Sequence, residues 1–360
     1  MIKKAKLWES LEDKKVECHV CANECIITPG NVGICGTRKN IDGEIFSLTY
    51  GSMISKGSID PIEKKPLYHF YPGTSVYSIA SIGCSFRCKN CQNWRISQAT
   101  PSEDGSSGTI DFENYRGGEM DLVEMSPEEL VEKVKKSGAR SVAYTYNEPL
   151  IWHEWIIDTA ELLKKEGITT VLVTNGYSTP EASEELINVG IDAANIDIKS
   201  MQDEFYKEIC GVPTLKPVLE TAKRFKNNGI HVEITNLIIP DKNDSDEELK
   251  QLCEWIYENL GANTPLHFSA YRPMYKKPSK QSTPKKLLVN AYDIAKNVGL
   301  KYPYIGNVRD RRGSNTFCPK CGMVLIERSG FSVSLKGIEN GNCAECGYDL
   351  KQDLKGLEVN

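Results

Sequence analysis

The sequence has no hydrophobic run long enough to cross a membrane. None of its stretches reaches the ~18 apolar residues that a spanning helix needs. The N-terminal stretch MIKKAKLWESLEDKK contains lysines but no apolar core, which argues against a signal peptide. There is also no block of basic residues, and the net charge is −5, so we do not expect nucleic acid as a partner. These absences predict a cytoplasmic protein that does not act on a membrane.

Cysteine is the residue type that the sequence has in unusual number. The chain contains 13 cysteines, and structural disulfides are rare in the reducing cytosol. Most of them fall into three clusters, which predicts metal binding. The clusters are Cys18, Cys21, Cys25 and Cys35; Cys84, Cys88 and Cys91; and Cys318, Cys321, Cys343 and Cys346. Cys210 and Cys253 stand alone, and we expect them to be buried as small apolar residues.

Strand-like and helix-like segments alternate between residues 75 and 310. The clearest helix signal is SPEELVEKVKKSG, in which Ser126 caps the helix, Pro127 opens it and Glu129 completes a capping box. The alternation predicts an α/β fold, specifically a partial or full (β/α) barrel whose apolar strands are buried on both faces. The strand candidates are 75–83, 141–146, 169–174, 193–199, 230–239 and 266–271.

The cysteine clusters divide the chain into three predicted modules. We expect an N-terminal cysteine-rich metal-binding module over residues 1–72, the β/α barrel over 73–312 and a zinc-ribbon-like module over 313–360. The segment 97–124 is polar, acidic and rich in glycine. Because it follows the central cysteines, we predict that it is a lid or mobile loop that packs over them.

The central cysteine cluster comes directly after a predicted strand. Cys84, Cys88 and Cys91 have the spacing C-x3-C-x2-C in the stretch GCSFRCKNCQNW. Sites in parallel β/α barrels form at the C-terminal ends of the strands, so this loop is predicted to lie at the barrel mouth. Thiolates are the usual ligands of iron–sulfur clusters, and three of them leave one corner of a four-iron cluster open. The alternative is a zinc site of three cysteines that a nearby histidine, such as His69, completes.

This cysteine loop resembles that of the radical S-adenosylmethionine (SAM) superfamily. The resemblance implies that Cys84, Cys88 and Cys91 hold a 4Fe-4S cluster. It also implies that the amino and carboxylate groups of SAM chelate the fourth iron. The reduced cluster would then cleave SAM into methionine and a 5′-deoxyadenosyl radical, which abstracts hydrogen from a substrate. An electron donor of the flavodoxin or ferredoxin type is expected, and the cofactor supplies the difficult chemistry.

Two strand ends match segments that hold SAM in this superfamily. YTYNEP lies where relatives bind the methionine amino group, so Asn147 and Glu148 are the expected acceptors. VTNG resembles the Thr-Asn-Gly of the third strand, which adds Thr174 and Asn175 to the expected cofactor-binding residues.

A third strand end, NIDIKS, resembles the Asp-x-Lys of activating enzymes. Asp197 and Lys199 alternate along the strand and are expected on the same side of it. The resemblance implies that Lys199 binds the methionine carboxylate and that Asp197 binds a ribose hydroxyl or a cation; an ordinary salt bridge is the alternative. Relatives often have an aromatic residue before the third cysteine, but this chain has Asn90. Phe86 or Trp94 is expected to frame the adenine instead.

Segments along nearly the full length resemble a narrower group, the AmmeMemoRadiSam-system radical SAM enzymes. These are often labelled homologues of pyruvate formate-lyase-activating enzyme. The similarity implies partner proteins of the Ammecr and Memo kinds. One alternative is that the protein activates a glycyl-radical enzyme, and a weaker one is a metal-binding scaffold without turnover. The matching segments are DPIEKKPLYHFYPG, CQNW, YTYNEP, NDSDEEL and YIGNV.

The two flanking cysteine sets have different spacings. The C-terminal set consists of the knuckles CPKC (318–321) and CAEC (343–346), which is typical of a four-thiolate zinc ribbon. Zinc, or iron in a rubredoxin-like site, is expected there, with redox-active disulfides as the alternative. The N-terminal set, from Cys18 to Cys35, has intervals of two, three and nine residues. It could hold one zinc or iron ion, or an auxiliary iron–sulfur cluster that relays electrons.

Overall fold

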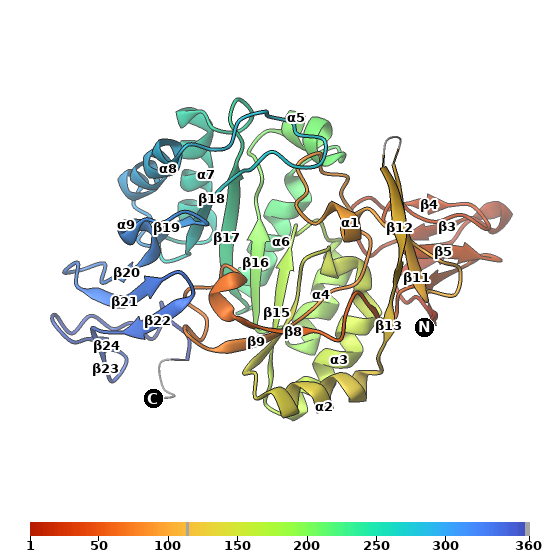
Figure 1. The fold of residues 1–360 in the computed structure, drawn as a ribbon, viewed down its shortest axis with the longest axis horizontal. Helices are drawn as coiled ribbons and strands as arrows, with labels where there is room; N and C mark the ends of the chain where they lie inside the picture. The colour runs from red at the N-terminus through yellow and green to blue at the C-terminus, as the bar shows by residue number, and fades with distance from the viewer. Residues whose placement is uncertain (113–114, 357–360) are drawn as a thin grey trace.

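An eight-stranded sheet forms the centre of the protein (Figure 1). The computed structural model describes residues 1–112 and 115–356. Seven strands are parallel, and β8 pairs antiparallel with β9 at one edge. In the described chain no hydrogen-bonded pair joins the two edges, β19 and β8. The strand order is β19 (Pro303–Gly306), β18 (Leu266–Ala270), β17 (His231–Ile238), β16 (Ala193–Asp197), β15 (Thr169–Thr174), β14 (Ser141–Tyr144), β9 (Ser75–Ile79) and β8 (Ser58–Pro61).

The six predicted strands are confirmed, and helices lie between them in the chain as expected. The Ser126 hydroxyl accepts a hydrogen bond from the Glu129 backbone N–H, the Glu129 carboxylate accepts one from the Ser126 backbone N–H, and Gly138 ends the helix with φ 68°. Strand and helix side chains together form one large buried cluster. In the described residues no helix has the length and apolar character needed to cross a bilayer. The long helices are α2 (Pro127–Ser137), α3 (His153–Lys165), α4 (Pro180–Val189), α6 (Lys216–Asn227), α7 (Asp246–Asn259) and α8 (Lys285–Val298).

The segment 62–71 packs against one face of the central sheet and covers that face along part of the length of the strands. Strand residues two apart share a face, and on β16 they meet different surroundings. Ala193 packs with Leu67 in a small apolar cluster. The amide of Asn195 donates to the Pro66 carbonyl at 2.8 Å. Asp197, at the carboxyl end of the strand, lies beyond the segment and lines a cavity. The segment 62–71 therefore leaves the carboxyl ends of the strands open.

Smaller sheets lie at the two ends of the molecule (Figure 1). The N-terminal strands form two three-stranded sheets, and the C-terminal strands form a three-stranded sheet and a two-stranded one. Residues 58–61, in the expected N-terminal module, join the central sheet as β8. The N-terminal sheets are β1 (Lys3–Lys4), β6 (Glu44–Ser47) and β5 (Arg38–Ile41), and β2 (Trp8–Ser10), β3 (Val16–Cys18) and β4 (Ile26–Ile27); the C-terminal strands are β20 (Thr316–Phe317), β21 (Val324–Ser329), β22 (Ser332–Leu335), β23 (Ile338–Glu339) and β24 (Asn342–Cys343).

The segment 97–124 is not the expected loop. It forms the antiparallel strands β10 (Thr100–Pro101), β11 (Ser107–Phe112) and β12 (Tyr115–Asp121), and β13 (Val123–Glu124) pairs with β7 (Ser52–Met53). These strands pair mostly with each other. The polar and glycine-rich composition of the segment therefore did not predict that it forms strands. Ala99 and Leu122 pack on Ile82, just before the cysteine loop.

A buried ion pair joins the N-terminal module to α3. Arg38 on β5 donates to both carboxylate oxygens of Glu154, at 2.9 and 2.7 Å. Both side chains are at most 2% exposed. Removal of one partner leaves a buried charge uncompensated, so we expect Arg38→Ala to lower the free energy of unfolding by ~3–5 kcal/mol, measured by denaturant titration. As a control, Lys135→Ala removes an exposed ion pair with Glu166 and is expected to leave stability unchanged; an equal effect of the two variants would contradict the prediction.

Candidate active site

A cavity of about 330 Å³ lies at the carboxyl ends of the parallel strands. The three central cysteines line it together with residues at the ends of six strands. Because neighbouring parallel strands end at the same edge of a sheet, residues far apart in the chain meet there. The strand-end residues are Thr145, Thr174, Asp197, Leu237, Ser269 and Asn307.

The three cysteine side chains reach this cavity from one loop. Cys84 and Cys91 are half-buried and Cys88 is buried. The Cys84 sulfur accepts from the Phe86 backbone N–H at 3.4 Å, and the Cys91 sulfur lies 3.1 Å from the Ser97 hydroxyl. Burial raises the pKa of the Cys84 and Cys91 thiols. The loop thus presents three thiols to one enclosed space.

A fourth thiol, that of Cys210, lies beside the loop. Cys210 is fully buried, as expected for an isolated cysteine, but it is not remote from the site. Its thiol interacts with that of Cys88 and is the main cause of the raised Cys88 pKa, with burial as the next cause. Its carbonyl accepts the Arg87 backbone N–H at 2.7 Å. Spacing along the chain could not reveal this contact, because more than a hundred residues separate the two cysteines.

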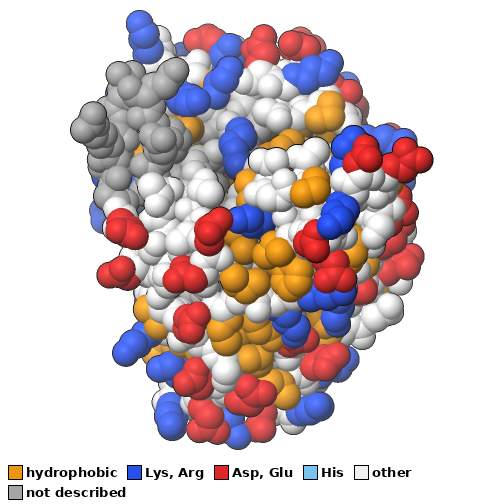
Figure 2. All heavy atoms as spheres, turned by 90° about the vertical axis from the view of Figure 1, so that its right-hand side faces the viewer, with side chains coloured by type: hydrophobic (Ala, Val, Ile, Leu, Met, Phe, Trp, Pro, Cys, Tyr) orange, Lys and Arg blue, Asp and Glu red, His pale blue; other side chains and the backbone are white. Residues whose placement is uncertain are grey.

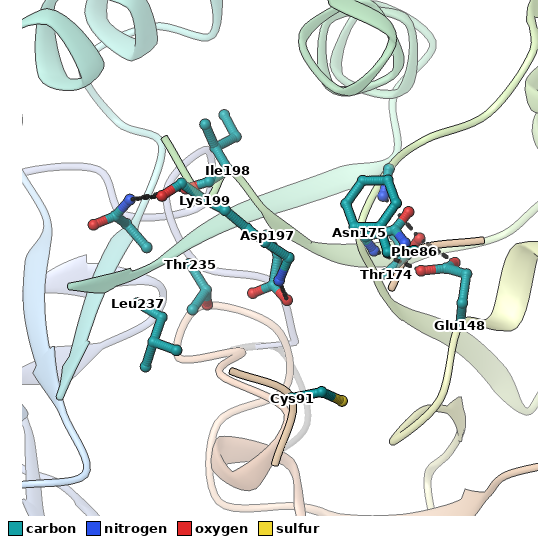
Figure 3. Close-up of polar contacts among 12 residues, drawn as sticks. Phe86, Cys91, Glu148, Thr174, Asn175, Asp197, Ile198, Lys199, Thr235 and Leu237 are labelled. Atoms are coloured by element: carbon teal, nitrogen blue, oxygen red, sulfur yellow. Dashed lines mark hydrogen bonds and ion pairs between the residues drawn. The ribbon is translucent and has the colours of Figure 1, made fainter. Parts of the chain in front are cut away.

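One hydrogen-bonded group combines Glu148, Thr174 and Asn175 on one side of the cavity (Figure 3). The Glu148 carboxylate accepts from the Thr174 hydroxyl at 2.6 Å and from the backbone N–H groups of Asn175 and Leu150 at 2.8 and 3.0 Å. Burial raises the pKa of Glu148 to about 7, against the lowering effect of these three donors. The Asn175 amide donates to the Ser85 hydroxyl at 3.0 Å. The group therefore fixes the end of β15 against the cysteine loop.

Asn147 holds the stretch that precedes Cys84. Its side-chain oxygen accepts from the Ser81 backbone N–H at 3.2 Å, and its amide donates to the carbonyls of Ile82 and Gly83 at 3.4 and 3.2 Å. The side chain is buried in the cavity wall. Its polar atoms thus have partners within the protein.

Asp197 and Lys199 form a second polar group, seen in Figure 3 apart from the first. The Lys199 ammonium lies 2.8 Å from one Asp197 carboxylate oxygen. Burial opposes the charge of Lys199, but Asp197 and the thiols of Cys88 and Cys210 raise its pKa well above the usual value. The Asp197 side chain is 34% exposed. The site therefore has a fixed cation next to the thiols and a carboxylate that faces the cavity.

Asn90 has an unpartnered polar atom in the cavity wall. The residue is 6% exposed, and its side-chain oxygen is buried without a hydrogen-bond partner. Phe86 also lines the cavity, held edge-on by Tyr177 and Tyr206 at ring distances of 5.2 and 6.0 Å. Trp94 instead stacks on Tyr275, with ring centroids 5.4 Å apart. Phe86 is thus the aromatic residue of the predicted pair that the cavity wall contains.

The C-terminal cysteines form a compact four-thiol group. All four sulfur atoms lie within 4.8 Å of one another, and the pairs Cys318–Cys346 and Cys321–Cys343 are each 3.6 Å apart. Four sulfurs around one tetrahedral ion with bonds of ~2.3 Å would be about 3.8 Å apart. The group has the geometry to bind a metal ion.

Fold and cavity together define an α/β protein with a cysteine-lined site at the carboxyl end of a parallel sheet. The sequence profile of the radical SAM superfamily matches residues 78–256. Uncharacterized protein MJ0808 of Methanocaldococcus jannaschii is 44% identical over 351 residues, which cover 97% of this chain and 99% of that protein. The pyruvate formate-lyase-activating enzyme of Clostridium pasteurianum is 30% identical over 181 residues, 48% of this chain and 66% of that enzyme. The structure of Streptococcus suis SuiB bound to S-adenosylmethionine aligns with a TM-score of 0.48 and 16% identity, covering 67% of this chain and 50% of that one.

The chain belongs to the radical SAM superfamily, as its cysteine loop predicted. It is therefore an enzyme, and membership implies that it uses SAM and an iron–sulfur cluster. The residues present fit these groups. Thiols are the usual ligands of iron–sulfur clusters, and three of them line one cavity together with the Lys199 ammonium and the unpartnered Asn90 oxygen.

Proposed function

We propose that the protein cleaves SAM reductively and abstracts hydrogen from a substrate bound in the cavity at the carboxyl ends of the strands. The observation that carries this proposal is that Cys84, Cys88 and Cys91 line one cavity with the Asp197–Lys199 pair. When bound there, the cluster and SAM supply an electron and a 5′-deoxyadenosyl radical. That the cavity draws on strands from one side of the sheet to the other supports a partial barrel around it.

The side chains of this site divide into ligands, contacts and positioning groups. Cys84, Cys88 and Cys91 hold three corners of the 4Fe-4S cluster. Lys199 neutralises the methionine carboxylate of SAM, because its ammonium is fixed next to the Cys88 thiol. Asp197 accepts from a ribose hydroxyl with the part of its carboxylate that faces the cavity.

Four residues act on the cofactor through their position. Asn147, Glu148, Thr174 and Asn175 line the cavity, but their side chains are hydrogen-bonded to each other or to the cysteine loop. We assign them the task of fixing the strand ends against which SAM lies. The unpartnered oxygen of Asn90 then accepts from the adenine amino group, since it would otherwise stay buried without a partner.

The test is anaerobic reconstitution with iron and sulfide, followed by addition of dithionite and SAM. We expect 5′-deoxyadenosine and methionine to form, and deuterium from a labelled substrate to appear in the 5′-deoxyadenosine. A reconstituted protein that holds a 4Fe-4S cluster at the three cysteines but releases no 5′-deoxyadenosine would refute the proposal.

The proposed substrate lies within the AmmeMemoRadiSam system, with Ammecr- and Memo-type proteins as partners and a flavodoxin or ferredoxin as the electron donor. The resemblance of segments along the chain supports this. Activation of a glycyl-radical enzyme is the second candidate, because a pyruvate formate-lyase-activating enzyme is 30% identical over 181 residues. A stable radical on a glycine of a protein substrate would favour the second candidate over the first.

Replacement of Cys210 tests whether SAM or a protein thiol binds the fourth iron of the proposed cluster. If SAM holds the fourth iron, Cys210→Ala should keep a full complement of iron and continue to form 5′-deoxyadenosine. The electron paramagnetic resonance (EPR) spectrum of the reduced cluster should also still shift when SAM is added. If the thiol next to Cys88 were the fourth ligand, the variant would lose iron, and the wild-type spectrum would not respond to SAM.

The flanking sets complete the proposed three modules, over residues 1–72, 73–312 and 313–360. The compact C-terminal thiols support a structural zinc site, and Cys18, Cys21, Cys25 and Cys35 make up the second flanking metal site. A zinc ribbon folds around its metal, so chelation should release one zinc ion per chain and lower the melting temperature. The same chelator applied to Cys343→Ala, which lacks the site, should cause no further change; equal melting temperatures of zinc-loaded and zinc-free wild type would contradict a structural role.

A further inference from the structure

The N-terminal thiols are arranged differently from the C-terminal ones. In the residues that the structure describes, two groups of three or more metal-ligating side chains have all their ligand atoms within 4.8 Å of one another. One is the C-terminal set of cysteines, and the other is Glu9, Glu17 and His19. The N-terminal cysteines form no such group, and neither do Cys84, Cys88 and Cys91. Four thiolates on a single ion require short sulfur–sulfur distances, whereas a cluster with several irons separates its cysteines.

The N-terminal thiols nevertheless lie near enough to interact with one another. Cys21 interacts electrostatically with Cys18, Cys25 and Cys35, and Cys35 also interacts with Cys18 and Cys25. Three of these sulfurs have a protein donor close by. The Asn23 amide lies 3.6 Å from the Cys21 sulfur, the Ile34 backbone N–H 3.5 Å from that of Cys25, and the Thr37 hydroxyl 3.4 Å from that of Cys35. Donors to sulfur of this kind tune the potential of iron–sulfur clusters.

The residues around these thiols contact the catalytic loop directly. The Asn23 amide that lies near the Cys21 sulfur also donates to the Ser85 carbonyl at 2.8 Å, one residue after Cys84. At Gly83, with φ 87°, a β-carbon would lie 2.7 Å from the Cys35 carbonyl oxygen, so only glycine permits this approach of the two loops. A short path of covalent bonds and hydrogen bonds therefore connects the N-terminal cysteines with the cysteines of the catalytic loop.

The outer side of the N-terminal thiol group reaches the protein surface. Cys25 is half-buried, and its neighbours Ile26 and Ile34 are 62% and 43% exposed. Figure 2 shows hydrophobic side chains gathered in the middle of the face that carries the N-terminal strands, with charged side chains around them. A reductant can thus approach one side of the group while the other side faces the catalytic loop.

We infer that Cys18, Cys21, Cys25 and Cys35 hold a polynuclear iron–sulfur cluster that passes electrons to the cluster at Cys84. A one-electron carrier protein is oxidised by one electron and reduces the N-terminal cluster by one. That cluster returns to its oxidised state when it gives the electron to the catalytic cluster. The metal assignment is independent of the proposed function, whereas the relay rests on it.

The deciding experiment uses the full chain with Cys84, Cys88 and Cys91 all replaced by Ala, reconstituted anaerobically with iron and sulfide. We expect about two or four irons per chain with equal acid-labile sulfide, and an EPR signal after reduction with dithionite. A properly folded triple variant that contains a second zinc ion, in addition to that of the C-terminal set, and no iron would overturn the inference. The zinc of the C-terminal set serves as the internal control for folding.

Mössbauer spectra of the iron-57-labelled wild type give a second measurement that needs no variant. We expect SAM to change one part of the iron spectrum and to leave the iron of the N-terminal cluster unchanged. If all the iron responds to SAM, the N-terminal cluster does not exist. If none responds and the triple variant still binds iron, the proposed function fails and the N-terminal cluster stands.

The complementary variant tests the relay. Replacing Cys21 and Cys25 by Ala should remove the SAM-insensitive iron and keep the SAM-responsive iron. Reduction of the remaining cluster by a reduced flavodoxin should become slower, while reduction by the small molecule dithionite should be less affected. An unchanged rate with flavodoxin would refute the relay.

Discussion

Replacement of any one of Cys84, Cys88 and Cys91 by Ala should abolish the formation of 5′-deoxyadenosine. Each thiol holds a different corner of the proposed cluster, so the loss of any one of them leaves one iron without its protein ligand. The expected loss is complete, to below the detection limit of chromatography after incubation with dithionite and SAM. The metal ion proposed for the C-terminal set should stay bound, because the strands β20 to β24 lie at one end of the molecule (Figure 1) and the four C-terminal cysteines do not line the cavity.

Cys253→Ala is the matched control for these three variants. Cys253 is fully buried on α7 and does not line the cavity. Its replacement removes a thiol without changing the proposed cluster ligands, so iron content and 5′-deoxyadenosine formation should match the wild type. Turnover by any of the three loop variants would show that the catalytic cluster lies elsewhere.

Glu148→Gln should change how stability depends on pH. The pKa of Glu148 is raised to about 7 in the folded protein, from 4.5 in an ordinary glutamate. The folded state therefore holds this proton more tightly than the unfolded state. As a result, the wild type loses stability as pH rises from about 4.5 to about 7, by about 3 kcal/mol in total from this group. The Gln variant cannot ionise and should lack this loss.

Denaturant titrations of both proteins at pH 5 and pH 8 measure the effect. The difference in unfolding free energy between wild type and variant should change by roughly 2.5 kcal/mol between the two values, because part of the loss has already occurred at pH 5. Glu166→Gln, which removes an exposed carboxylate in a surface ion pair, controls for a general effect of charge. Parallel pH curves of wild type and Glu148→Gln would show that Glu148 ionises normally.

Much of the fold could be predicted from local patterns. The six strand segments and the capped helix after Ser126 were confirmed because hydrophobic runs, caps and glycine ends are properties of adjacent residues. The strands within 97–124 were not predicted, because they have few apolar residues and are stabilised by pairing with each other. The filling of the inner face by residues 62–71 could not be foreseen either, since it depends on contacts such as that of Asn195 with Pro66.

The candidate site, like the fold, could be predicted from the sequence only in part. Spacing alone indicated the cysteine loop, and the superfamily match confirms the assignment of the chain to radical SAM proteins. The sequence did not show that Cys210 contacts Cys88 or that Asn90 has an unpartnered oxygen in the cavity. It also did not show that the carboxylate of Glu148 accepts three hydrogen bonds within the protein. Each of these contacts joins residues whose separation along the chain bears no relation to their distance in space.

The sequence by itself determined the ligand chemistry of this protein, because three thiols within eight positions of a loop can meet one metal centre whatever surrounds them. The order of strands and helices followed from local patterns as well. Only the tertiary structure decided which thiol sets are compact, which face the catalytic loop and which polar groups are free to bind a cofactor. Distances between sulfur atoms depend on how separate loops pack, and packing is a property of the folded chain.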